Sequence, residues 1–176
     1  MTMRRALKSL LKDRKAATAV EFAFVAPLFF ALVFSTIEAG WTMTQGMMLD
    51  RALDQTIRLV RLGSADAPKT QDAIRSAICS RTPVILDCRN VLSVEMVQIN
   101  TPADFPTDAA RCVDRSGAVN PTLRFSNGER ASIMYVRACA VVDPVTPLMG
   151  LALALPKDST GGYRLVSTSA FMNEPG

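Results

Sequence analysis

The sequence predicts an α+β protein. A long amino-terminal transmembrane helix continues beyond the membrane and is packed by a small antiparallel-sheet head domain with a short helix. Three observations lead to this prediction. Residues 22–37 carry no charge, residues 47–60 continue an apolar pattern at mostly helical spacing, and three strand-like runs follow residue 90. An apolar helix stripe and an apolar sheet face bury each other most simply when the sheet packs on the helix.

The apolar run from Ala16 to Trp41 predicts the transmembrane helix, which we place at residues 17–41. Its only charged residues are Glu21 and Glu38. About 20 apolar residues cross the ~30 Å hydrocarbon core of a bilayer. A buried helix of a soluble core is the first alternative, but a chain of 176 residues has little to wrap around it. A cleaved secretory signal is the second, but its apolar core is usually only roughly 7–15 residues long. Trp41 fits better as an anchor at the outer headgroup level.

The residues before the span predict its orientation. Residues 1–16 contain six basic side chains against the single acid Asp13, and they form a basic leader. Positive charge stays on the cytoplasmic side, so the leader is expected in the cytoplasm and the carboxyl end in the periplasm of a bacterial inner membrane. The leader carries a net charge of about +5 and the whole chain +4, so the remainder is close to neutral. Nothing in it resembles a basic patch for nucleic acid.

Residues 42–62 are expected to extend the helix into the periplasm. Apolar side chains recur there with charged residues between them: Met47, Leu49, Leu53, Ile57 and Val60. Gly63 and Pro68 then end the helix. Pro27 lies inside the membrane span, where it removes one backbone donor and predicts a kink.

Residues 64–176 are long enough for one modest core and form the periplasmic α+β head domain. We expect a short helix at residues 70–79 and strands at residues 91–99, 132–142 and 163–173. Prolines and glycines mark long loops at residues 100–131 and 143–162.

Two of the strands alternate clearly between apolar and polar residues. In the first, Leu92, Val94 and Met96 share one face, while Ser93 and Glu95 share the other. In the second, the inward set is Met134, Val136, Ala138, Ala140 and Val142, and the outward set is Tyr135, Arg137 and Cys139. The third strand alternates poorly, so its facing is left open.

Four cysteines, an even number, are expected on the oxidising side of the membrane, which predicts two disulfides. Of three connectivities we favour Cys79–Cys88, which ties the short helix to the strand entry, and Cys112–Cys139, which ties the proline-rich loop to the middle strand. A Cys₄ zinc site is the rival, but no pair has the spacing that such sites favour.

Enzyme chemistry has little support in the sequence. The chain contains no histidine, which removes the usual general base and the commonest metal ligand. No nucleophile elbow, zinc-protease motif or phosphate-binding glycine loop is present. We therefore predict no enzyme, no cofactor and no metal site.

The ionised carboxylate of Glu21 has an unfavourable free energy near hydrocarbon unless a positively charged group pairs with it. Cleavage between Ala16 and Ala17 would create an α-amino group four residues before Glu21, on the same helix face. The ammonium and the carboxylate could then pair, within one subunit or between neighbours. A small residue, a cut and a glutamate at the fifth position of the new chain are the logic of a type IV prepilin.

Residues 14–28, RKAATAVEFAFVAPL, resemble the start of TadE-like proteins, the pseudopilins of tight-adherence (Flp-type IVb) pilus systems. Residues 85–88 and 167–175 resemble the family more weakly. The resemblance implies a role in pilus assembly, with Ala16 and Ala17 flanking the processed bond and Glu21 as the recognition glutamate. Type IV prepilins mostly carry glycine where this chain has Ala16.

Two functions follow as hypotheses. The first is a pseudopilin or minor pilin that contacts the inner membrane, other pilins and pseudopilins, the pilus assembly platform and a prepilin peptidase. The second is an uncleaved, membrane-anchored periplasmic scaffold or binding protein of an envelope secretion or adhesion complex. The mature amino terminus separates them, because only the first expects a new start at Ala17.

Overall fold

The computed structural model describes residues 14–115, 117 and 123–174. The predicted leader therefore lies outside the described residues up to residue 13. The helices are α2 (Arg14–Arg61), α3 (Gln71–Cys79), α4 (Cys88–Val91), the 3₁₀ helix η1 (Pro102–Asp104) and α5 (Leu151–Ala154). The strands are β1 (Leu92–Ile99), β2 (Ile133–Val142) and β3 (Tyr163–Met172).

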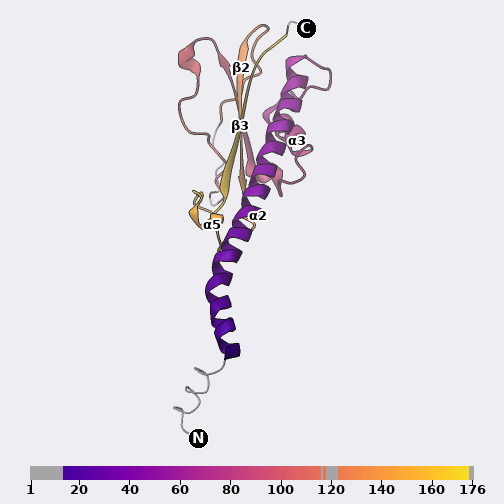
Figure 1. Ribbon diagram of the computed structural model, residues 1–176. Helices are drawn as coiled ribbons and strands as arrows, with labels where there is room; N and C mark the ends of the chain where they lie inside the picture. Colours follow the sequence, from indigo (N-terminus) through magenta and orange to yellow (C-terminus); the bar gives the residue numbers. More distant parts are fainter. Residues whose placement is uncertain (1–13, 116, 118–122, 175–176) are drawn as a thin grey trace.

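Helix α2 is unbroken over 48 residues, as the two successive apolar patterns predicted. Its first half projects beyond the head, and its second half packs along the sheet (Figure 1). Gly63 ends the helix in the left-handed region at φ 60°, with its N–H donating to Val60 at 3.1 Å. The next N–H, of Ser64, donates to Leu59 at 3.3 Å. These bonds satisfy carbonyls that the last turn would otherwise leave unpaired.

The sheet is antiparallel in the order β1-β2-β3. Helices α2 and α3 cover one of its faces, so the head has two layers with the core between them. The predicted inward sets of β1 and β2 are buried in this core against Leu53 and Ile57 of α2 and Ile74 and Ile78 of α3. The α+β prediction, with a long helix packed by a small antiparallel sheet, is therefore confirmed.

The second face of β1 and β2 is also buried, which the sequence patterns did not predict. Glu95, Arg137 and Cys139 are each no more than 6% exposed. The chain between β1 and β2 folds back over them, and we call residues 105–115 and 123–126 of it the covering segment. It also occupies the outer edge of β1, where Met96 exchanges backbone hydrogen bonds with Arg124 and Ser126 at 3.0 and 2.9 Å. This contact pairs backbone groups that an edge strand would otherwise expose.

Several local details differ from the prediction. Val91 ends the helical turn α4 and does not begin β1, because the chain leaves Asp87 in the left-handed region at φ 50° and turns once before it extends. Two expected loops contain the short helices η1 and α5. Strand β3 does alternate: Tyr163, Ser167 and Phe171 are buried, while the residues between them are partly or largely exposed.

Candidate functional site

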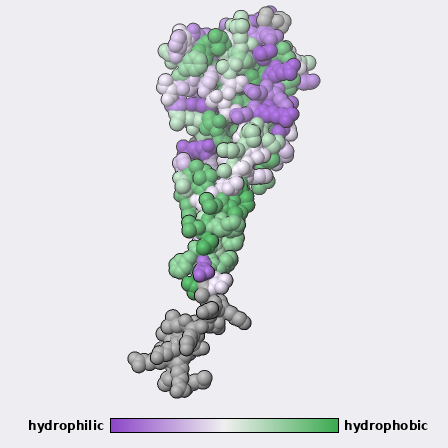
Figure 2. All heavy atoms as spheres, in the orientation of Figure 1, coloured by the Kyte–Doolittle hydropathy of each residue, from purple (hydrophilic) through white to green (hydrophobic). Residues whose placement is uncertain are grey.

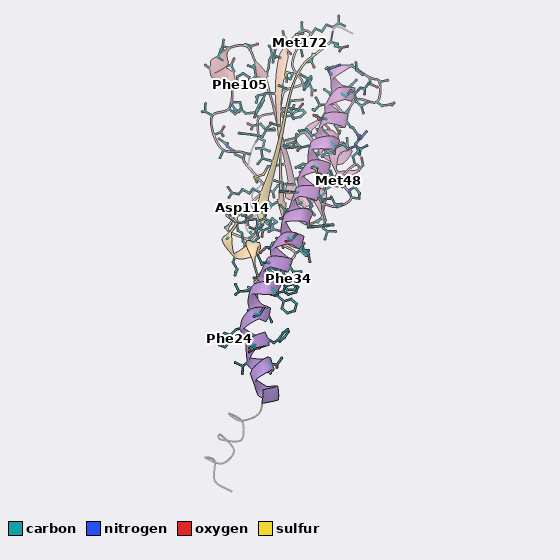
Figure 3. The ribbon with its side chains drawn as sticks, viewed as in Figure 1. Phe24, Phe34, Met48, Phe105, Asp114 and Met172 are labelled. Carbon is teal, nitrogen blue, oxygen red and sulfur yellow. A yellow bond between two sulfur atoms is a disulfide. The ribbon has the colours of Figure 1, made fainter. Side chains whose placement is uncertain are left out.

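The projecting half of α2 is the most unusual surface of the molecule. It is the one helix among the described residues that is long and apolar enough to cross a membrane, and the most apolar part of it is not buried by the head. Large apolar side chains are exposed along it: Val20, Phe22, Phe24, Val25, Leu28, Phe29, Phe30, Leu32 and Ile37. Phe24 lies well below the head, and Phe34 lies at its lower edge (Figure 3). This surface is compatible with a single-pass membrane protein.

Ala16, Ala17 and Glu21 all lie in the first two turns of α2. Ala17 and Glu21 are four residues apart within the helix, which places them one turn apart on the same face. The Glu21 side chain is exposed.

Pro27 lies within α2, and the helix continues through it. A proline has no N–H, so the Ala23 carbonyl lacks its usual helical partner. Ala26 and Pro27, together with Phe30 and Ala31, line an apolar groove on this side of the helix. The opposite wall of the groove is formed by Leu148 and Leu153 of the head.

Glu38 is the functional-site residue that sequence reasoning missed. It lies inside the predicted membrane span, yet its side chain is fully buried. Its carboxylate accepts hydrogen bonds from the backbone N–H groups of Val145 at 3.1 Å and Thr146 at 2.7 Å. The Thr146 hydroxyl donates a further bond at 2.8 Å. A buried carboxylate requires such partners, so Glu38 holds the chain after β2 against the helix.

Tyr163 at the start of β3 is buried in the same region. Burial, followed by the nearby negative charge of Glu38, raises the pKa of this phenol above its ordinary value of 10.0. Both effects disfavour the phenolate, so Tyr163 is neutral at physiological pH.

A second contact holds the chain after β2 one turn lower on α2. The Ser35 hydroxyl donates to the Ala31 carbonyl at 2.6 Å and accepts from the Leu151 N–H at 3.0 Å. Gly150 precedes this contact at φ 56°. A Cβ atom at this position would lie 2.9 Å from the Ala31 carbonyl oxygen and would also meet the Ser35 hydroxyl. Only glycine therefore allows this close approach to the helix.

Trp41 is 41% exposed and lies one turn beyond Glu38. Its indole shares an apolar groove with Val84 and Leu86 on the α3–α4 side and with Val145. The predicted interfacial anchor is therefore a partly exposed aromatic side chain at the lower edge of the head.

The four cysteines form two disulfides. Cys79–Cys88 joins the end of α3 to the start of α4, with a Cα–Cα distance of 5.6 Å. Cys112–Cys139 joins the covering segment to β2, with a Cα–Cα distance of 5.2 Å. The first bond therefore joins two helices, and the second fixes irregular chain to a strand.

Beside the second disulfide lies a buried ion pair that the sequence did not indicate. Arg137 of β2 bonds Glu95 of β1 at 2.6 Å, and both side chains are 7% exposed. The Arg137 guanidinium also donates to the Asp108 carbonyl at 2.7 Å, while Arg124 reaches Glu95 at 3.2 Å. Burial opposes the charge on Arg137, but the hydrogen bonds and negative charges of Glu95 and Asp108 together outweigh that effect and raise the pKa of the guanidinium. These contacts fix the covering segment to the sheet.

The part of this chain that is similar to known proteins lies in helix α2. Residues 16–58 match the sequence model of TadE-like proteins. The chain carries a TadE-like segment. No curated protein and no solved structure matches the chain. The TadE-like match supports a pseudopilin associated with a Tad pilus in general, and such proteins are pilus components that are not known as enzymes.

The TadE-like segment covers almost all of α2, including Glu21, Pro27 and Glu38. It ends three residues before the helix does. The sheet, both disulfides and the chain that Glu38 holds lie outside it. The match therefore concerns the membrane-compatible helix, and the head must be interpreted from its own contacts.

Proposed function

We propose that this protein is a pseudopilin or minor pilin that takes part in assembly of a tight-adherence, Flp-type IVb pilus. One observation carries the proposal. The segment that matches TadE-like proteins is a helix whose exposed apolar half has Ala17 and Glu21 one turn apart at its start. The proposed role needs a helix that can lie in the membrane and a carboxylate near its amino end, and α2 with Glu21 has both.

In this proposal the chain sits in the inner membrane, with its basic leader in the cytoplasm and its disulfide-bonded head in the periplasm. A prepilin peptidase cuts between Ala16 and Ala17. The new α-ammonium group then pairs with a Glu21 carboxylate, of the same subunit or of a neighbouring pilin. Pairing removes the cost of leaving either charge alone beside hydrocarbon.

The size of the head favours a minor component that initiates, caps or assists assembly. The head spans residues 64–176 in our domain division, and both faces of two of its strands are covered. Its hydrogen bonds with α2 extend down to Ser35, so the head is attached to the lower part of the helix as well as to its upper half. Its partners in the proposal are other pilins and pseudopilins and the assembly platform.

The mature amino terminus of protein purified from its own host tests cleavage. We expect a chain that starts at Ala17 in the wild type and an intact leader in an Ala16→Leu variant, because a bulky side chain does not fit where small residues are required. An intact leader in the wild type would contradict processing. It would favour the second hypothesis, an uncleaved periplasmic scaffold.

Glu21 variants test the pairing separately. Glu21→Gln and Glu21→Leu should each reduce pilus formation, because neither can pair with an ammonium group. Asp50→Asn is the matched control, since Asp50 is another exposed acid on α2 that lies far from the cut. Normal pilus numbers in both Glu21 variants would remove the pairing from the mechanism.

A further inference from the structure

The chain between Pro144 and Pro156 has an unusual composition for a loop. It reads PVTPLMGLALALP and contains no charged residue, although Asp143 and Lys157 flank it directly. Several of its apolar side chains are exposed: Val145, Leu148, Met149 and Leu153. Leu148 is 81% exposed and Leu153 is 66% exposed, which is costly in water for leucine. An exposed apolar cluster of this kind marks a contact surface.

The position of this segment relative to α2 identifies the environment that it meets. Its backbone contacts the helix at Ser35, through Leu151, and at Glu38. Ser35 lies six residues before Trp41, which is about 9 Å along the helix axis. If Trp41 lies at the outer headgroup level, the exposed leucines lie at the depth of the acyl chains.

Continuity of the apolar surface supports the same environment. Leu148 and Leu153 share one groove with Pro27, Phe30 and other residues of the exposed half of α2. In the space-filling view, the apolar surface extends without interruption from the projecting helix onto the lower part of the head (Figure 2). Phe105 and Met172, by contrast, lie at the opposite end of the head (Figure 3).

Most backbone N–H groups of the segment have a hydrogen-bond partner. The N–H groups of Val145 and Thr146 bond Glu38, and that of Leu151 bonds Ser35. Further N–H groups are paired within the segment, with distances of 3.1 to 3.2 Å: Met149 to Thr146, Leu153 to Gly150, and Leu155 to Leu151. Prolines at three positions of the segment have no N–H to satisfy. Irregular backbone is tolerated at membrane depth where it is buried against protein, and the bonds to Glu38 and Ser35 hold the backbone of this segment against α2.

We propose that the Pro144–Pro156 segment is a second membrane-contacting element, which inserts into the outer leaflet beside α2 and contacts lipid acyl chains through Leu148 and Leu153. This inference rests on the membrane insertion of α2 in the proposed function. Glu38 and Ser35 attach the segment to the helix. The head is thereby held at a fixed depth and orientation on the membrane.

Depth-dependent fluorescence quenching in the full-length protein tests the proposal. Trp41 is the only tryptophan, so a Trp41→Phe background accepts a single new reporter. We place it at Leu153, at Met172 as an apolar control that is 57% exposed at the far end of the head, and at Leu28 on the projecting helix. Each variant is reconstituted into phosphatidylcholine vesicles whose acyl chains carry bromine.

The proposal expects quenching of Leu153→Trp to be several-fold stronger than that of Met172→Trp, and comparable with that of Leu28→Trp. Equal, weak quenching at positions 153 and 172, with strong quenching at position 28, would overturn it and leave the membrane helix intact. A third outcome would also contradict the proposal: no bromine quenching at position 153, together with an emission that changes with the protein-to-lipid ratio. That result would mean that a second copy of the chain covers the segment. Weak quenching at position 28 as well would show that α2 does not insert into the membrane, which would contradict the proposed function.

Discussion

Glu38 and Thr146 lie 108 residues apart in the chain and meet through two hydrogen bonds, one from the Thr146 N–H and one from its hydroxyl. One partner belongs to the apolar part of α2, and the other begins the segment that follows β2. Because the Glu38 side chain is fully buried, these bonds do not compete with water. They couple the membrane-compatible helix to the head domain.

Replacement of Glu38 should therefore destabilise the folded head. Glu38→Ala leaves the Val145 and Thr146 N–H groups without an acceptor, and a buried unsatisfied group costs about 1–3 kcal/mol. Glu38→Gln keeps one carbonyl oxygen and should lose less. Denaturant unfolding of the detergent-solubilised protein measures both changes, and Asp54→Ala serves as an exposed acid of the same helix. A loss for Glu38→Ala no greater than for Asp54→Ala would show that the contact contributes little.

Local patterns predicted most of the regular structure. The uncharged run and the mostly helical spacing of apolar residues after it predicted α2, and Gly63 predicted where the helix ends. Thr70 is an N-cap whose hydroxyl accepts from the Ala73 N–H at 3.2 Å, and it begins the short helix where the sequence indicated. Alternation gave the core faces of β1 and β2. Each of these features depends on residues within a few positions of one another, which periodicity and capping rules describe well.

The contacts that the sequence did not reveal join distant segments. In the sequence Glu38 is only one of two charges in an apolar run, and its partners lie more than 100 residues away. Arg137 and Glu95 were expected to face outward, since polar residues on alternate strand positions usually meet water. The covering segment that buries them has no periodic pattern, and only the disulfide to Cys139 indicated that it contacts β2. Long-range polar contacts leave little trace in local composition.

Gly150 provides a test of the close approach between the head and α2. Gly150→Ala should destabilise the protein by more than the roughly 1–2 kcal/mol that a left-handed conformation costs a non-glycine residue. The backbone of Gly150, at φ 56° and ψ −132°, lies outside the left-handed helical region, and the added Cβ would also meet Ala31 and Ser35. Gly63→Ala is the control for a positive φ, 60°, in open space. Thermal unfolding compares them. Equal losses in melting temperature would show that the helix accommodates the methyl group.

The two disulfides should contribute unequally to stability. In the chain-entropy model, closing a loop of 27 residues contributes about 3.5 kcal/mol and closing one of 9 residues about 2.6 kcal/mol. Paired replacement of Cys112 and Cys139 by alanine should therefore cost about 1 kcal/mol more than paired replacement of Cys79 and Cys88. Denaturant unfolding of the two double variants measures the difference. A larger loss for the shorter loop would mean that local packing around α3 and α4 outweighs the loop entropy.

Removal of one partner from the buried ion pair should be more harmful than removal of both. Arg137→Met leaves Glu95 buried with only Arg124 beside it, and such a change costs about 3–5 kcal/mol. The double variant Arg137→Met with Glu95→Leu should recover much of the loss, because no uncompensated charge remains. Arg124→Met is the control, since its side chain is 61% exposed and exposed pairs contribute about 0–1 kcal/mol. Unfolding free energies of the wild type, the single variants Arg137→Met and Glu95→Leu and the double variant measure this coupling, and a loss in the double variant equal to the sum of the two single losses would contradict this account.

Asp158 predicts a specific dependence of stability on pH. Burial opposes ionisation of its carboxyl, but hydrogen bonds from the Gly162 N–H at 2.8 Å and from Thr160 outweigh that effect and hold its pKa below the ordinary value of 3.8. A carboxyl whose pKa is lower in the folded state than in the unfolded state binds fewer protons when folded, so its stabilisation is complete above pH 3.8 and disappears as the pH falls through the folded value. The difference in unfolding free energy between wild type and Asp158→Asn should accordingly be largest near neutral pH and shrink in acid. A difference that stayed constant from pH 7 down to the acid transition would mean that the carboxylate charge contributes nothing to the turn that leads into β3.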